Sequence, residues 1–169
     1  NSYGDDNFGQ GVLLARRLVA RQVRFVEVQL GGWDTHQNNL TRVPERCAIL
    51  DQALSALLKD LTQRGMLDET LIVLASEFGR TPNINVNEGR DHYPKAFSCM
   101  LAGGGIKGGQ VWGKTDKEGR EVVEQKVEIP DLNATIAYAL GLPLDEIIYS
   151  PTRRPFTLSD KGQPITRLI

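Results

Sequence analysis

The sequence has few histidines and cysteines, and it lacks both a long apolar run and an excess of charge of one sign. Two histidines and two cysteines occur among its 169 residues. No apolar segment approaches the roughly 20 residues that a membrane-spanning helix needs. The formal net charge of −1 excludes the basic surface expected of a nucleic-acid-binding protein and a polybasic patch for a membrane. We therefore expect neither a membrane span nor a nucleic-acid partner.

The two cysteines, Cys47 and Cys99, lie far apart in apolar periodic segments. This placement predicts buried free thiols rather than a disulfide, and it gives no indication of the redox compartment. The chain begins at Asn1 without a methionine or a visible signal peptide. We interpret this start as that of a processed product, an engineered product or a fragment of a longer chain.

The apolar residues alternate between helical and strand-like spacing along the chain. Helix punctuation supports the assignment, with Pro44 expected in the first turn of one helix and Gly65 just past its end. Helices alternating with strands predict an α/β fold with a largely parallel sheet. The predicted helices are 8–22, 44–64 and 130–140, the strands are 23–30, 70–75 and 96–102, and hairpins are expected at 111–128 and around 160–162.

Both histidines stand in sequence typical of metal ligands. His36 follows the predicted strand 23–30 in Asp34-Thr35-His36, and His92 follows Asp91. Imidazole and carboxylate groups together suit zinc, iron or manganese, and do not suit calcium alone. Ligands gather beyond the carboxyl ends of parallel strands, so Asp34 and His36 should lie near Glu77, which follows the strand 70–75.

His92 precedes the third predicted strand, 96–102, and at first fits this arrangement poorly. It joins the others if that strand runs antiparallel, or if the long loop 79–95 folds back. We then predict Asp34, His36 and His92 as metal ligands, with Glu77 close by. Arg80 has the fork geometry to bind a tetrahedral oxyanion, and Asp91 is predicted to orient His92.

Each of these residues also has a structural explanation. Asp34 is a common turn or capping residue, and Arg80 could be an ordinary surface arginine. A single surface Asp-X-His is more often structural than functional. Two histidines in matched motifs shift the balance towards a site, and a Lewis acid there would act on a phosphoryl or sulfuryl oxygen.

At these residues the chain resembles an uncharacterised bacterial sulfatase-like family that belongs with the alkaline phosphatase superfamily. The resemblance extends over nearly the whole chain. The matching segments are 25–28, 33–36, 74–82, 89–94, 130–136 and 148–151.

The resemblance implies a two-metal site and a Ser, Thr or formylglycine nucleophile. Asp34, His36 and His92 resemble the ligands of one metal. The segment 70–79 resembles the strand whose terminal Asp and His bind the second metal, but here those positions are Glu77 and Phe78. Phenylalanine cannot bind a metal, and no Ser or Thr of this chain matches the nucleophile, which the superfamily places upstream.

The resemblance therefore implies an alkaline-phosphatase-like α/β sandwich, with a mostly parallel sheet flanked by helices, one antiparallel strand and small C-terminal β-hairpins. Residues 1–169 would form a single domain that is the C-terminal part of a longer one. We expect a metal-dependent hydrolase-like protein for anionic sulfate or phosphate esters, inactive as this chain alone. Zinc is favoured, with iron, manganese or calcium as alternatives, and an extracytoplasmic setting is implied.

The alternative function is a non-catalytic metal-binding or structural module descended from such an enzyme. Phe78, in place of a ligating histidine, favours it. A partner role in export or adhesion has no positive feature in the sequence. Substrate, oligomeric state and the identity and number of the metals are open at this point.

Overall fold

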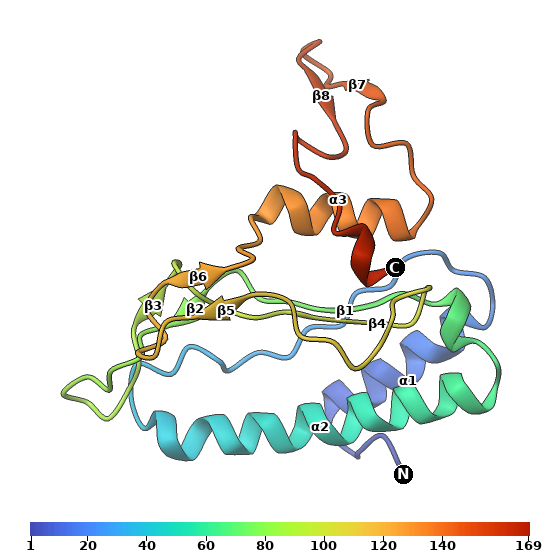
Figure 1. Cartoon of the computed structure of the whole chain (residues 1–169). Helices are drawn as coiled ribbons and strands as arrows, with labels where there is room; N and C mark the ends of the chain where they lie inside the picture. The colour runs from blue at the N-terminus through green and yellow to red at the C-terminus, as the bar shows by residue number, and fades with distance from the viewer. The chain divides into compact units, whose positions relative to one another are not determined.

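A computed structural model describes all residues 1–169, which divide into two compact units. The first unit comprises Asn1–Leu67 and Phe78–Phe97, and the second comprises Asp68–Glu77 and Ser98–Ile169. Figure 1 shows the chain coloured along its length. The single-domain organisation expected from the sequence stays a prediction.

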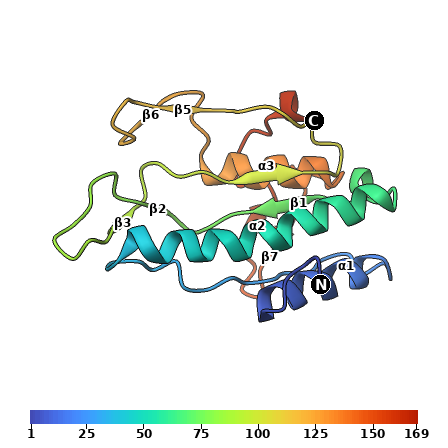
Figure 2. The ribbon, with the colours of Figure 1, turned by 90° about the horizontal axis from the view of Figure 1, so that it is seen from below.

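Two helices build the first unit, and both were predicted. Helix α1 (Asn7–Val19) begins after Asp6, whose Oδ1 accepts hydrogen bonds from the backbone N–H groups of Phe8 and Gly9. Helix α2 (Asn39–Gln63) runs beside it (Figure 2). Their shared core contains Tyr3, Val12, Ala53 and Ala56, with Phe8, Leu13, Val28 and Leu57 packed around it.

Helix α2 begins earlier than the sequence predicts. Asn38 adopts a left-handed conformation (φ 50°), and its N–H and that of Asn39 donate to the carbonyls of Asn87 and Glu88 at 3.3 and 2.8 Å. A distant loop therefore caps the first helical N–H groups, which places Pro44 inside the helix rather than in its first turn. The predicted end is confirmed, with Gly65 at φ 65° after the last turn.

A short antiparallel ladder completes the first unit. Strand β2 (Gly79–Arg80) pairs with β3 (His92–Tyr93), and Arg80 stands opposite His92. The loop between them thus folds back on itself, as one of the two sequence-based arrangements for His92 requires. The second arrangement also occurs, because the third predicted strand runs antiparallel within the second unit.

The second unit consists of short antiparallel pairs and one helix. Strand β1 (Ile72–Leu74) pairs with β4 (Met100–Ala102), β5 (Lys114–Thr115) with β6 (Val122–Glu124), and β7 (Ile147–Tyr149) with β8 (Pro155–Thr157). Helix α3 (Ile129–Ala139) carries a capping box formed by Glu128 and Asp131. Short 3₁₀ helices occur at Leu67–Glu69 and Thr166–Leu168. The hairpin of β7 and β8 extends away from α3 (Figure 1).

The predicted alkaline-phosphatase-like sandwich is wrong. All four sheets have two strands, every pair is antiparallel, and no parallel sheet forms. The predicted strand 23–30 makes no ladder, although its sequence alternates. Its Val28 packs instead on the helical core. Strand β1 is half-buried rather than enclosed on both faces. Alternating apolar and polar residues give an extended segment one apolar face that must be buried. Helices can bury this face as well as neighbouring strands can.

Smaller corrections concern the cysteines and the tail. Cys47 and Cys99 are free, as predicted, but both are exposed rather than buried. The C-terminal hairpin turns at 150–154, and residues 160–162 form a separate turn after β8. The predicted hairpin at 111–128 and helix at 130–140 are confirmed as β5–β6 and α3. No helix combines the length and the apolar character that crossing a membrane requires.

Candidate metal centre

Three predicted ligands meet at one point of the first unit. Asp34 and His36 lie in the irregular segment before α2, and His92 lies on β3. The Nε2 atoms of His36 and His92 are 3.2 Å apart. Asp34 Oδ1 is 3.0 Å from each of them. Two segments separated by more than 50 positions thus bring three potential ligand atoms into one small triangle.

The size of this triangle matches the requirement of a small transition-metal ion. A tetrahedral zinc ion with bonds of about 2.0–2.1 Å holds its ligand atoms roughly 3.3 Å apart. The observed separations are 3.0–3.2 Å. The three side chains keep between 41% and 67% of their surface exposed, so one side of the triangle is open to solvent. Asp34, His36 and His92 could therefore hold a divalent ion and leave a position for another ligand.

Asp91 orients His36, not His92 as the sequence suggests. His36 Nδ1 lies 2.8 Å from Asp91 Oδ1, and hydrogen bonds from His36 and Asn85 lower the pKa of Asp91 below its ordinary value. A carboxylate can only accept, so Nδ1 of His36 carries the proton in this contact. The opposite nitrogen, Nε2, is the one that points into the triangle, which is the arrangement of a carboxylate–histidine–metal unit.

Arg80 contacts the cluster from β2. Its Nη2 donates to Asp34 Oδ1 at 2.8 Å, and its Nη1 donates to the carbonyl of Arg90 at 3.3 Å. Hydrogen bonds from His92 and Arg80 lower the pKa of Asp34 from 3.8 to about 2. Asp34 therefore stays a carboxylate, which is the form that binds metals, throughout the neutral and mildly acidic range.

Two residues that the sequence reasoning did not assign to the site support the histidines. Phe78 packs against His92 with ring centroids 4.3 Å apart, so the residue that cannot bind a metal instead fixes a ring that can. Asn85 donates from Nδ2 to Asp91 Oδ1 and to the carbonyl of His36. Alternating asparagines at 83, 85 and 87 indicate a turn, but nothing local distinguishes Asn85.

The loop that carries Asp91 lies close against the chain at His36. A Cβ atom built on the buried Gly89 would come within 2.0 Å of the carbonyl carbon of His36. The N–H of Arg90 donates to the carbonyl of Thr35 at 3.0 Å. Thr35 is buried and its Oγ1 accepts from Asn39 Nδ2 at 2.7 Å. Glycine at 89 therefore permits the close backbone contact between the segment of His36 and the loop that carries Asp91.

The grouped ligands are three of the four residues predicted to bind metal, Asp34, His36 and His92. Glu77 belongs to the second unit, where its Oε2 accepts a hydrogen bond from Ser76 Oγ at 3.0 Å, and it is not one of the grouped ligands. Its assignment to a metal stays a prediction.

A family model covers the whole chain. It is described as a protein of unknown function (DUF1501) and matches residues 1–169. The chain belongs to this family. No curated protein and no solved structure matches the chain. The family description names no activity, so a function can be inferred only from the geometry of the histidine cluster.

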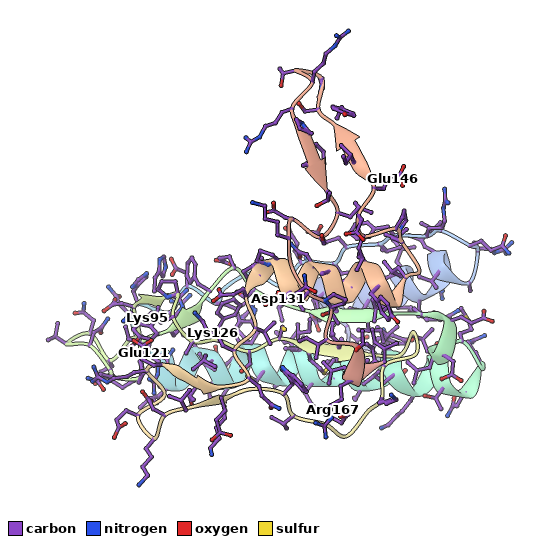
Figure 3. The ribbon with its side chains drawn as sticks, turned by 45° about the horizontal axis from the view of Figure 1, so that its top comes forward. Lys95, Glu121, Lys126, Asp131, Glu146 and Arg167 are labelled. Atoms are coloured by element: carbon purple, nitrogen blue, oxygen red, sulfur yellow. The ribbon has the colours of Figure 1, made fainter.

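A second concave feature lies in the second unit. A pocket of about 410 Å³ is lined by Trp112, Asp131 and the segments 125–127 and 163–167. Figure 3 labels Lys126, Asp131 and Arg167 around it. Both carboxylate oxygens of Asp131 accept backbone N–H groups, those of Glu128 and Gln163, and Lys126 pairs with Glu128 at 2.7 Å. These polar groups are therefore already engaged in contacts that stabilise the local fold.

Proposed function

We propose that this protein provides the divalent-metal centre of a hydrolase for phosphate or sulfate esters, with Asp34, His36 and His92 as ligands and zinc as the favoured ion. The observation that carries the proposal is the triangle of two Nε2 atoms and one carboxylate oxygen with edges of 3.0–3.2 Å. Two histidines and a carboxylate with an open position are the ligand set of many catalytic zinc sites.

The surrounding side chains support this role. A bound ion would act as a Lewis acid on a phosphoryl or sulfuryl oxygen of the ester. Arg80 uses two of its N–H donors on Asp34 and Arg90, and a guanidinium has five. The remaining donors suit a non-bridging oxygen of the ester, since Arg favours tetrahedral anions. Arg80 would thus hold both the carboxylate ligand and the anionic substrate.

The attacking nucleophile would come from outside the three proposed ligands, Asp34, His36 and His92. Thr35 is the hydroxyl residue nearest in sequence to the ligands, but it is buried and bonded to Asn39. The attacking group would therefore be solvent water or a group outside the cluster. The open side of the triangle, where the ligands are exposed, is where such a group would enter.

A non-catalytic metal-binding module is the second candidate, and Phe78 favours it. The Phe78 ring covers His92 with centroids 4.3 Å apart and gives the site an apolar wall where a further ligand would serve a two-metal mechanism. In that case the metal would hold the β2–β3 loop against the segment before α2, without turnover.

Metal content tests the proposal. Purified protein should contain or take up one equivalent of zinc, iron or manganese, measured by elemental analysis, and His36→Ala should lose it because one of three ligands is gone. Gln37→Ala changes an exposed neighbour and serves as the matched control. A folded wild-type protein that takes up no metal would refute both candidates.

Turnover then separates the two candidates. Metal-dependent cleavage of an aryl phosphate or aryl sulfate, lost in His36→Ala and kept in Gln37→Ala, supports the hydrolase. Stoichiometric metal without any turnover in the complete protein supports the non-catalytic module.

A further inference from the structure

Asn85, in the loop between β2 and β3, uses every hydrogen-bonding position of its side-chain amide. Its Oδ1 accepts from the backbone N–H groups of Asn87 and Gly89, each at 2.9 Å. Its Nδ2 donates to Asp91 Oδ1 at 3.1 Å and to the carbonyl of His36 at 3.2 Å. An amide has one acceptor oxygen and two N–H donors, and here both ends find two complementary partners.

These partners fix which way the amide faces. If the amide were flipped, its NH₂ group would meet two N–H donors and its oxygen would meet a carboxylate and a carbonyl, so four attractive contacts would become repulsive. The donor end of Asn85 must therefore face Asp91 Oδ1, which is also the atom that contacts His36 Nδ1 at 2.8 Å. One carboxylate oxygen is held from both sides, by an amide N–H and by an imidazole N–H.

The loop turns Asn85 inward although it has apolar residues beside it. Val86 is 98% exposed and Ile84 is exposed as well, whereas Asn85 is half-buried. Burial of apolar area would favour the opposite arrangement, with valine and isoleucine inside. The four hydrogen bonds of the Asn85 amide offset this lost apolar burial. Two of them go to the His36 carbonyl and to Asp91 Oδ1.

We propose that Asn85 is the positioning residue of the metal centre: by fixing Asp91 it keeps the proton of His36 on Nδ1 and leaves Nε2 for the metal. This inference rests on the proposed metal-binding function. Asn85 does not touch the metal position; it acts through Asp91 Oδ1 and through the backbone carbonyl of His36. Outer hydrogen-bond partners of a metal-bound histidine typically account for about 10–100-fold in metal affinity.

The isosteric variant Asn85→Asp separates positioning from simple loop stabilisation. Aspartate keeps an oxygen for the N–H groups of Asn87 and Gly89, so the turn is retained. It loses both Nδ2 donors and puts a second carboxylate against Asp91, whose carboxylate then moves away from His36. Asn87→Asp adds the same charge two residues away, at an exposed side chain, and is the matched control.

Two measurements test the proposal. Zinc affinity, determined by competition with a chromophoric chelator, should fall about 10–100-fold in Asn85→Asp, and by less than about threefold in Asn87→Asp, whose charge is exposed and screened. Cobalt substitution should report the same change as an altered visible absorption spectrum in Asn85→Asp alone. Equal affinity and spectra in Asn85→Asp and the wild type, or equal losses in both variants, would overturn the proposal.

A third measurement needs no metal. Long-range proton–nitrogen NMR correlations of the metal-free wild type, at a pH where imidazole is neutral, should place the His36 proton on Nδ1. Asn85→Asp should move part of the population to Nε2. A wild-type proton on Nε2 would overturn the proposal even if Asn85→Asp does not fold. Failure of the wild type to bind zinc, with the Nδ1 tautomer confirmed, would refute the metal function and leave the orienting contact standing.

Discussion

Two turns of this protein are built in opposite ways. The β2–β3 loop bonds to a distant part of its unit, through Asn87, Glu88 and Arg90 to the segment 35–39. The β7–β8 turn bonds to itself, with the N–H of Ser150 donating to the carbonyl of Arg154 and the N–H of Arg153 to that of Ser150. The long-range contacts hold side chains from two distant segments next to one another, whereas the local contacts only close a hairpin.

The apolar residues follow the same contrast. Strands β7 and β8 leave Ile147, Tyr149 and Phe156 exposed, so this hairpin contributes little burial to its unit. An isolated two-stranded hairpin is marginally stable in water. The β2–β3 ladder is shorter, with two residues in each strand, and it depends on its loop contacts to persist. The two hairpins therefore differ in the number of long-range hydrogen bonds that hold their turns, rather than in the length of their strands.

The largest expected effect comes from Gly89→Ala. The new Cβ would lie within 2.0 Å of the His36 carbonyl carbon, so the two backbones must separate. Overpacking of this kind costs roughly 1–3 kcal/mol or more in unfolding free energy, and zinc binding should be lost. Denaturant titration and chelator competition measure the two effects.

Gly108→Ala is the control for that prediction, because a Cβ there meets nothing within 4 Å. It should leave both stability and zinc affinity unchanged. Wild-type zinc affinity in Gly89→Ala would show that the close contact does not hold the site.

Hydrogen exchange should sharpen the comparison between the two turns. The amides of Asn39 and Arg90, which bond across the first unit, should exchange about a hundredfold more slowly than the Arg153 amide of the β7–β8 turn, because local opening costs less where contacts are few. Exchange monitored by NMR gives each rate. Similar rates at all three amides would contradict this difference between the two turns.

A smaller effect is expected on the pKa of Asp34 in the histidine cluster. The pKa of Asp34 is about 2 because His92 and Arg80 stabilise its carboxylate. Their support is complete above the ordinary value of 3.8 and is lost as the pH falls through about 2. In Arg80→Gln, a carboxyl carbon NMR titration should show this pKa rising towards 3.8. An unchanged value would mean that His92 alone sets it.

The smallest effect should come from the hairpin. Tyr149 is exposed on β7, and substitutions at such positions change stability by within about 0.5 kcal/mol. Tyr149→Ser should therefore leave the denaturation midpoint and the zinc affinity as they are. A loss well beyond that range would show that the hairpin packs against something in solution.

The site could be predicted in part because its ligands come from compact motifs. Asp34-Thr35-His36 and Asp91-His92 each place their polar side chains within two or three adjacent residues. A fold-back of the loop 79–95 was one of the two arrangements expected to bring His92 to the other residues. The partner of Asp91 was predicted wrongly because adjacency favours His92, while the observed contact to His36 crosses 55 residues. The sequence around Asn85 does not indicate its contacts, because they form only when the segment of His36 lies against the loop that carries Asp91.

The fold was predicted less well, for a related reason. Capping and spacing within one segment identified α1, α3 and the end of α2. The parallel sheet was inferred from the order of the elements, and order does not determine which strands pair. The segment 23–30 shows the difference, since its alternation is real but helices rather than strands lie against its Val28.

The capping of α2 has a mechanical consequence. Its first N–H groups donate hydrogen bonds to the carbonyls of Asn87 and Glu88. The start of this 25-residue helix is therefore held by the same loop that carries Asp91. Displacement of this loop would break these hydrogen bonds and let the first turn of α2 fray. A more rigid loop would keep the first turn helical for longer. Binding of the proposed metal ion would thus change how often one end of this helix, about 38 Å long, frays.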